Sequence, residues 1–285
     1  MNPIDKRNEA RRDLSRRLIE RGFTLGIYEG IEALLPPVCA VPAGEFLMGR
    51  DPLRDLPDRR DFEPQHAVWV EAFSIGQYPV TVAEYHCFVD AGGEPPAKHG
   101  WSADWQTQLQ RPEHPVVRVT WDQAMAYSRW LAGLTGESWR LPTEAEWEKA
   151  ARWDDSTHQA RVYPWGERYD RLRANTSNHG PGTTTPVGRY PRGASPYGVL
   201  DMAGNVYEWC SSYFLPYPYN AQDGRESPHA GVPQAYYRVR RGGAWDRTWH
   251  HTRCAHRSAD VPFLNSDAQG FRLACGAAPA CISSS

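Results

Sequence analysis

Three histidines and two aspartates gather in a short stretch near the C-terminus, and their types could hold a metal ion. They are His250, His251, His256, Asp246 and Asp260. Imidazole and carboxylate groups are common metal ligands. Adjacent residues of an extended segment point to opposite faces, so His250 and His251 are not expected to ligate one ion. We therefore predict surface or pocket histidines without a metal, and a metal site built in another way is the alternative.

The spacing of the six cysteines does not predict a metal site either. They stand at Cys39, Cys87, Cys210, Cys254, Cys275 and Cys281. None forms a CxxC pair, and their spacing matches no zinc pattern. Nothing in the chain resembles a Ser-His-Asp triad or an HExxH helix.

Residues 246–268 have an unusual composition. These 23 positions contain no Lys, Glu, Gln or Met. An Asn codon mutated at its adenines reaches every amino acid except those four and Trp, and retroelement diversification acts on such codons. Only Trp249 lies outside the accessible set, and it could be a fixed position. The alternative interpretation is an ordinary loop that is not diversified.

The same stretch has the chemistry of a recognition surface. It mixes aromatic anchors with histidines, arginines and short polar side chains, as adaptable binding surfaces do. We predict that the ligand is contacted by Trp245, Asp246, Arg247, Trp249, His250, His251, His256, Asp260, Phe263 and Asn265. The sequence admits either a protein or a small molecule as this ligand.

The composition of the whole chain narrows its class. Of its 285 residues, 40% are hydrophobic and 23% are charged, and the formal net charge is −2. This length allows one large domain with a substantial core. The near-neutral charge gives no reason to expect a nucleic-acid partner. We expect no membrane span and no signal peptide, because long apolar runs are missing, and hence a cytoplasmic protein with reduced thiols.

Three segments can be distinguished along the chain. Residues 5–35 show apolar positions at helical spacing, and Pro36-Pro37 ends the pattern. We therefore predict a helical extension over residues 1–38 that docks on the domain or mediates association. The main domain is expected over 39–275, and a small, polar, fraying tail over 276–285.

Local signals predict the elements of the main domain. The expected strands lie over 41–49, 66–70 and 114–120. Thr81, Thr120 and Thr143 are the expected N-caps of three helices. The last helix has Glu146 three residues after its cap, which is a capping box. With 24 Gly and 24 Pro in the chain, the stretch 163–245 is expected to be mostly loop.

Motifs spread along the chain resemble the sulfatase-modifying-factor family, to which the formylglycine-generating enzymes belong. The matching segments are 42–49, 78–81, 140–148, 163–166, 201–209, 241–245 and 270–272. Gly242-Gly243-Ala244-Trp245 and Gly270-Phe271-Arg272 frame the stretch 246–268. The ordered matches cover about 40–275 and identify the chain as a member. The resemblance implies an α+β, C-type-lectin-like fold with small antiparallel sheets, few helices and long loops.

Membership alone does not fix the activity, because one fold carries several functions. The family includes copper-dependent oxidases, iron-dependent sulfoxide synthases, and variable proteins of diversity-generating retroelements. The oxidases hold Cu(I) with two cysteines between their Gly-Gly-Ser-Trp and Arg-Cys-Ala segments. The corresponding interval 246–252 is shorter and contains no cysteine, and Cys254 lies outside the redox pair. We therefore expect no copper.

The iron-dependent members take metal ligands from an additional helical domain with an HxxxHxE-type segment. The first 38 residues contain no histidine, so this site is not expected either.

The resemblance also implies a structural Ca²⁺ ion. Carried over by position, its ligands would be the side chains of Asp201 and Glu208 and the carbonyls of Gly204 and Val206. Hard oxygen donors suit this ion. The alternative is that the two carboxylates accept hydrogen bonds from backbone amides in a tight turn.

The sequence thus predicts a non-catalytic ligand-binding protein with its recognition surface at about 245–269, as in the variable proteins of diversity-generating retroelements. One alternative is another ligand-binding role. The other is a metal-dependent oxidase or oxygenase that uses a metal site without cysteines in the same concavity.

Overall fold

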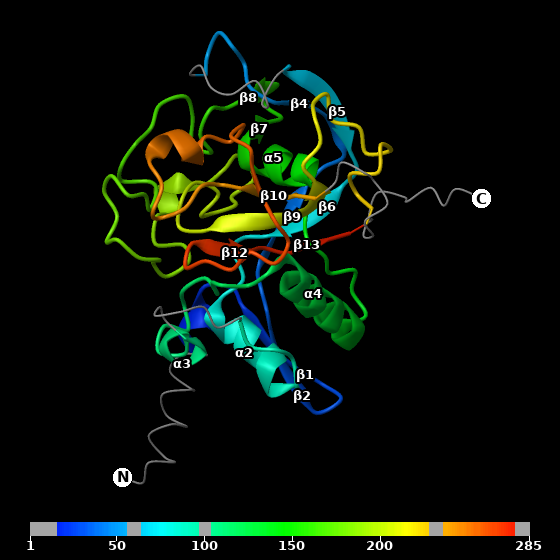
Figure 1. The fold of residues 1–285 in the computed structure, drawn as a ribbon, viewed down its shortest axis with the longest axis vertical. Helices are drawn as coiled ribbons and strands as arrows, with labels where there is room; N and C mark the ends of the chain where they lie inside the picture. The colour runs from blue at the N-terminus through cyan, green and yellow to red at the C-terminus, as the bar shows by residue number, and fades with distance from the viewer. Residues whose placement is uncertain (1–15, 56–63, 97–103, 228–235, 277–285) are drawn as a thin grey trace, which may run out of the picture.

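A four-stranded sheet lies at the centre of the computed structural model, which describes residues 16–55, 64–96, 104–227 and 236–276 (Figure 1). Its strand order is β11-β10-β9-β12. The bounds in that order are Ser258–Asp260, Arg238–Arg241, Tyr207–Tyr213 and Gln269–Phe271. The β10–β11 and β9–β10 pairs are antiparallel, and β12 runs parallel to β9.

Smaller antiparallel sheets surround this one. The two-stranded sheets are β1–β2 (Thr24–Tyr28 and Ile31–Leu35), β4–β5 (Gly44–Met48 and His66–Val70) and β7–β8 (Trp153–Asp154 and Gln159–Ala160). A three-stranded sheet has the order β13-β6-β3 (Ala274–Cys275, Phe73–Gly76 and Val38–Val41). The strands predicted over 41–49 and 66–70 are therefore confirmed.

The helices after residue 35 are few, and three of them begin where the sequence indicates. They are α2 (Val82–Asp90), α3 (Trp105–Gln108), α4 (Trp121–Thr135) and α5 (Glu144–Arg152), with two 3-10 turns, η2 (Pro191–Gly193) and η3 (Trp249–Thr252). Thr81, Thr120 and Thr143 cap α2, α4 and α5, each within a capping box. All three predicted N-caps are confirmed.

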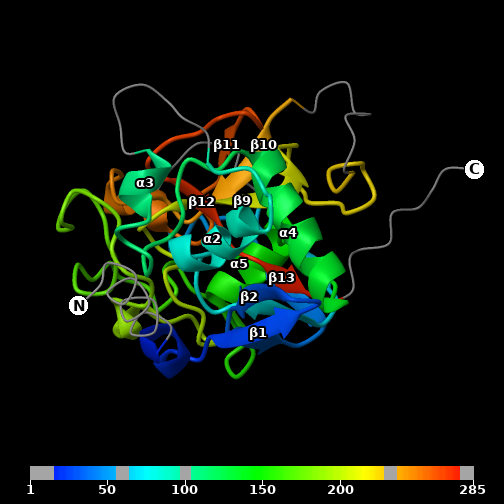
Figure 2. The same ribbon diagram turned by 90° about the horizontal axis from the view of Figure 1, so that it is seen from below.

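Helices cover both faces of the central sheet. Helix α5 lies on one side, and α2 and α4 lie on the other (Figures 1 and 2). Side chains of a strand alternate between faces, and β9 follows this rule. Trp209 is buried with residues of α2 and α4, whereas its neighbour Cys210 is buried with residues of α5 such as Trp147. The α+β class with small sheets and long loops is confirmed.

The predicted N-terminal helix is wrong over most of its described length. Residues 16–20 are helical, but 24–35 form the β1–β2 hairpin. Glu29 and Gly30 make its two-residue turn with positive φ angles of 50° and 85°, a conformation that favours glycine and joins antiparallel strands. Apolar side chains of this part pack on the domain, as the burial of Phe23 shows. Residues 1–15 lie outside the described part.

The strand predicted over 114–120 is also wrong. This segment contributes only an isolated bridge between Pro115 and Thr81. Arg118 adopts a positive φ of 64°, which interrupts an extended strand. Its N–H group donates to the carbonyls of Ser266 and Gln269 at 3.1 and 3.0 Å. The segment therefore docks on the chain next to β12 instead of joining a sheet.

Two further expectations concern the rest of the chain. The stretch 163–245 is mostly loop, but it includes the two central strands β9 and β10. In the described ranges, no helix is long and apolar enough to cross a bilayer. The predicted tail lies outside the described part except for Gly276.

Glu84 in α2 is expected to make stability depend on pH. Its carboxylate accepts hydrogen bonds from the N–H and the hydroxyl of Thr81 at 2.6 and 2.7 Å, and burial raises the pKa of Glu84 to about 8. This pKa is above that of a glutamate in the unfolded chain. Between the two values, the folded state therefore binds a proton that the unfolded state releases. The contribution of Glu84 to stability therefore falls as the pH rises from about 4.5 to about 8.

The variant Glu84→Gln keeps the capping acceptor without the charge. It is expected to remove a decline on the order of 4 kcal/mol over this pH range. Urea unfolding near pH 5 and near pH 8 measures the difference. Glu146→Gln, at the equivalent position of α5, is the control and should keep the decline. An unchanged pH slope in Glu84→Gln would contradict the prediction.

Candidate functional site

Buried ion pairs fix the position of the segment 246–268. Glu144 and Glu148 lie four residues apart on α5 and therefore share one helix face. Arg257 donates to both carboxylate oxygens of Glu144 at 2.7 and 2.8 Å. Arg241 of β10 pairs with Glu148, and all four side chains are fully buried. The segment is thus anchored to the helix that covers the central sheet.

The electrostatics of these pairs keep Glu144 and the two arginines charged. Burial alone would raise the pKa of Glu144, but the guanidinium groups of Arg257 and Arg241 outweigh it and hold the pKa below its usual value. Burial also opposes the charge of Arg241, yet Glu148 raises the pKa of this arginine above its usual range. Removing one partner would leave a buried charge without compensation.

Other contacts hold the middle and the ends of the segment. Arg253 donates to a carboxylate oxygen of Asp55 at 2.7 Å and to the carbonyl of His250 at 2.8 Å. The indole N–H of Trp245 donates to the carbonyl of Asp267 at 3.0 Å and so joins the two ends. These contacts with buried groups therefore hold the backbone of the segment in place.

An array of stacked rings forms where this segment meets the loop 163–169. Trp249 stacks on Tyr169, with ring centroids 5.8 Å apart, and on His250, at 3.5 Å. Tyr169 contacts Tyr163 at 5.8 Å, and Tyr163 stacks on Trp165 at 5.4 Å. We call these five residues the aromatic ladder. His250 is exposed at its end, and Trp249 is partly exposed.

The other two predicted histidines contact each other and are less exposed than His250. The rings of His251 and His256 meet edge to face, with centroids 5.0 Å apart. Burial, and then the proximity of His251 and Arg253, lowers the pKa of His256 well below its usual value. Within the described ranges, no three or more His, Cys, Asp or Glu side chains are placed to hold a metal ion.

The remaining predicted contact residues fall into separate places. Asp246 and Arg247 are exposed and face each other, with an N–O distance of 3.5 Å. Asp260 on β11 pairs with Arg240 at 3.1 Å. Phe263 is 63% exposed in the turn after β11, and Asn265 follows, half-buried. Asp246, Arg247 and Asp260 therefore lie in ion pairs, whereas Phe263 is open to solvent.

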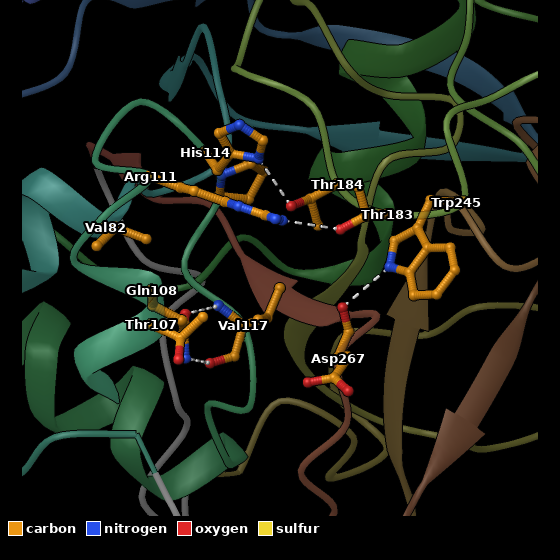
Figure 3. Close-up of a pocket in the computed structure, with 12 residues that line it drawn as sticks. Val82, Thr107, Gln108, Arg111, His114, Val117, Thr183, Thr184, Trp245 and Asp267 are labelled. Carbon is orange, nitrogen blue, oxygen red and sulfur yellow. Dashed lines mark hydrogen bonds between the residues drawn. The ribbon is translucent and has the colours of Figure 1, made fainter. Parts of the chain in front are cut away.

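Trp245 lines a pocket at the base of the segment (Figure 3). Its other polar lining residues include Arg111, His114, Thr183 and Thr184, which the sequence analysis does not single out. These residues belong to loops that lie far apart in sequence, so no local motif marks them. Only their meeting in the fold identifies the pocket.

The residues proposed for calcium have other partners. Arg272 donates to both oxygens of Glu208 at 2.6 and 2.7 Å, and the indole of Trp147 donates to one of them at 2.6 Å. Asp201 accepts a hydrogen bond from the N–H of Gly188 at 2.7 Å, and burial raises the pKa of Asp201 to about 6. Glu208 therefore does not fit a calcium ligand in this arrangement. The carbonyls of Gly204 and Val206 alone do not replace a carboxylate. The calcium ion therefore stays a prediction, which metal analysis of the protein would test.

Cys254 is unsuited to redox chemistry. It is fully buried, and its thiol donates to the carbonyl of Ala151 at 3.7 Å. Burial raises the pKa of Cys254 to about 12. The thiolate, which is the nucleophile and the metal ligand, is therefore disfavoured.

The fold and these motifs define a C-type-lectin-like domain of the formylglycine-generating-enzyme type. The family described as "sulfatase-modifying factor enzyme 1-like domain" matches residues 31–277, and the chain belongs to this family. Its match to the family confirms the resemblance drawn from the motifs.

Several relatives share about a third of their residues with the chain. The serine/threonine-protein kinase pkn1 of Chlamydia caviae is 35% identical over 86% of this chain and 39% of its own length. Hercynine oxygenase of Mycolicibacterium smegmatis is 33% identical, over 82% and 60%. The formylglycine-generating enzyme of Streptomyces coelicolor is 34% identical, over 82% and 87%. The chain thus spans less than two thirds of the first two proteins.

Solved structures share the fold. PvdO from Pseudomonas aeruginosa superposes with a TM-score of 0.69 and 26% identity, covering 88% of this chain and 97% of PvdO. Treponema denticola variable protein 1 superposes with a TM-score of 0.66 and 22% identity, covering 89% and 98%. The second likeness concerns the fold alone.

Proposed function

We propose that this protein is a non-catalytic ligand-binding module whose recognition surface is formed by residues 245–268. The observation that carries the proposal is that some side chains of this segment anchor it in the core while others face the solvent. Its inward arginines, Arg253 and Arg257, are bound to buried carboxylates. Its outward side chains, such as Trp249 and His250, are available for contact. A rigid base with adaptable outward residues suits recognition.

The composition of the segment supports diversification of this surface. Exposed positions such as Asp246, Arg247 and Phe263 carry residues that a mutated Asn codon can encode. The fold shared with variable protein 1 of Treponema denticola is compatible with such a role. A near-identical second copy of the codons for 240–275 beside a reverse-transcriptase gene, differing mainly at adenines, is the expected genomic arrangement.

The second candidate is a metal-dependent oxidase or oxygenase. The identity with hercynine oxygenase and with the formylglycine-generating enzyme favours it. Metal analysis of the protein purified without chelators separates the two functions. Stoichiometric copper or iron would favour the oxidase and overturn the proposal, whereas Ca²⁺ alone would support binding and the calcium prediction together.

A display library tests recognition directly. The codons of the exposed residues Asp246, Arg247, His250 and Phe263 are randomised, and the full chain is displayed on yeast and sorted against hen egg-white lysozyme. We expect most clones to reach the cell surface folded, because these side chains make few buried contacts, and we expect saturable binders to emerge.

A matched library that randomises Arg253 and Arg257 is the control, and it should lose display because buried carboxylates lose their partners. Loss of display in both libraries would contradict the proposal. So would a well-displayed outward library that yields no binder.

A further inference from the structure

A pocket of about 210 Å³ lies at the base of the segment 246–268 (Figure 3). It has room for about seven water molecules, at roughly 30 Å³ each, and so for one small organic molecule. Its walls come from the start of α2, from the end of α3 and the chain that follows it, from the loop 182–184, and from Trp245 and Asp267. The pocket is a separate place from the aromatic ladder, because none of the five ladder residues lines it.

One wall supplies a positive charge without a carboxylate partner. The Arg111 guanidinium donates to the hydroxyl of Thr183 at 3.2 Å, and none of the described acidic side chains pairs with it. A guanidinium has five N–H donors in a planar fork. Most of them remain available to a ligand, and this fork matches the two oxygens of a carboxylate.

His114 beside Arg111 adds hydrogen bonding but no second charge. Its Nδ1 lies 2.9 Å from the hydroxyl of Thr184. Burial, and then the charge of Arg111, lowers the pKa of His114 to about 4. The ring is therefore neutral near pH 7, and Arg111 alone provides the positive charge on this wall.

The remaining walls combine apolar groups with the polar side chains of Thr107 and Gln108 and one carboxylate, that of Asp267. Val82, Pro115 and Val117 line the pocket together with the indole of Trp245, whose N–H is already bonded to the carbonyl of Asp267. The ring of Trp245 therefore meets a ligand through its apolar surface. The carboxylate of Asp267 pairs with Arg118 through one oxygen. It disfavours a second negative charge on a ligand in this small space.

We propose that this pocket binds a small monocarboxylate with an apolar body. The ligand carboxylate contacts Arg111 and the nearby hydroxyls of Thr183 and Thr184, and the body packs against Trp245 and Val117. This pocket shares Trp245 and Asp267 with the segment 245–268, but its charged wall lies outside that segment, and it does not require the recognition surface to have a ligand.

Calorimetric titration of the full chain with phenylacetate tests the proposal. Saturable binding is expected, and Arg111→Gln should weaken it at least about tenfold, because a charge-assisted bidentate contact is lost. Arg129→Gln is the matched control, since Arg129 is exposed on α4 and outside the pocket. It should leave the affinity unchanged. Thermal unfolding of both variants confirms that they are folded.

Two further probes change the charge of the ligand and keep its phenyl ring. The neutral 2-phenylethanol and the dianion phenylmalonate should each bind at least about tenfold more weakly than phenylacetate. Equal affinity of phenylacetate for the protein and for Arg111→Gln would overturn the proposal, as would no saturation below about 10 mM. Equal affinity for 2-phenylethanol would also overturn it.

The outcome is distinguishable from that of the recognition surface. Trp249→Ala should leave phenylacetate binding unchanged, because Trp249 does not line the pocket. Loss of phenylacetate binding in Trp249→Ala would contradict the separation of the two sites.

Discussion

Replacing Arg272 with methionine is expected to lower the free energy of unfolding by about 3–5 kcal/mol. Arg272 is fully buried, and besides Glu208 it contacts the carbonyls of Gly76 and Leu200 at 2.9 and 2.8 Å. Methionine is apolar and leaves the Glu208 carboxylate buried with one donor, the indole of Trp147. Three distant parts of the chain would lose their common partner.

Urea unfolding followed by tryptophan fluorescence measures this loss. The double variant Arg272→Met/Glu208→Gln is the control, and it should recover at least about 1 kcal/mol because no unpaired charge remains. If Arg272→Met does not fold, recovery of folding in the double variant carries the same information. A loss below about 1 kcal/mol in the single variant would show that the pair is not the buried contact described.

Replacing Arg257 with methionine is expected to cost about 3 kcal/mol and to release the recognition segment. Arg257 binds both oxygens of Glu144 and donates to the carbonyl of Leu215 at 3.0 Å. Its guanidinium also lies over the ring of Tyr217, 4.0 Å from the centroid. Without these contacts, the chain around Arg257 loses its anchor to α5. Urea unfolding and the rate of limited proteolysis within 246–268 should both report the change.

A variant of the outward face provides the contrast. Asp246→Asn, Arg247→Ser, His250→Asn and Phe263→Tyr combined should stay within about 1 kcal/mol of the unmodified protein, because these side chains are exposed. Its proteolysis rate should also be unchanged. If the outward variant is as unstable as Arg257→Met, the division between anchored and available residues is wrong.

The helices of the fold are predictable from the sequence because their signals are local. In α5, Thr143 and Glu146 satisfy each other's backbone N–H groups within one turn. The β1–β2 hairpin is different. Ile27, Ile31 and Leu34 have helical spacing, and the turn at Gly30 outweighs this pattern. Its positive φ would interrupt a helix, so the glycine is the signal that contradicts the helix prediction.

The candidate site is predictable only in part. Exposed residues such as His250 and Phe263 follow from the composition of one continuous segment. The partners of the buried arginines do not, because charged side chains are ordinarily assigned to the surface. The pocket is even harder to predict from the sequence, because Arg111 and Thr183 are 72 positions apart in the chain and meet only in the fold. Such contacts depend on the complete fold.

The places of β12 and β13 have a consequence for how the chain folds. β12 supplies one edge of the central sheet, and β13 pairs with β6. Arg272, between these strands, bonds to Gly76 across 196 positions of sequence. Contacts of such high sequence separation require closure of a very long loop before they contribute, and this slows folding. We therefore expect both sheets to be completed only after β12 and β13 have left the ribosome, and a nascent chain ending before residue 269 to expose unpaired strand edges.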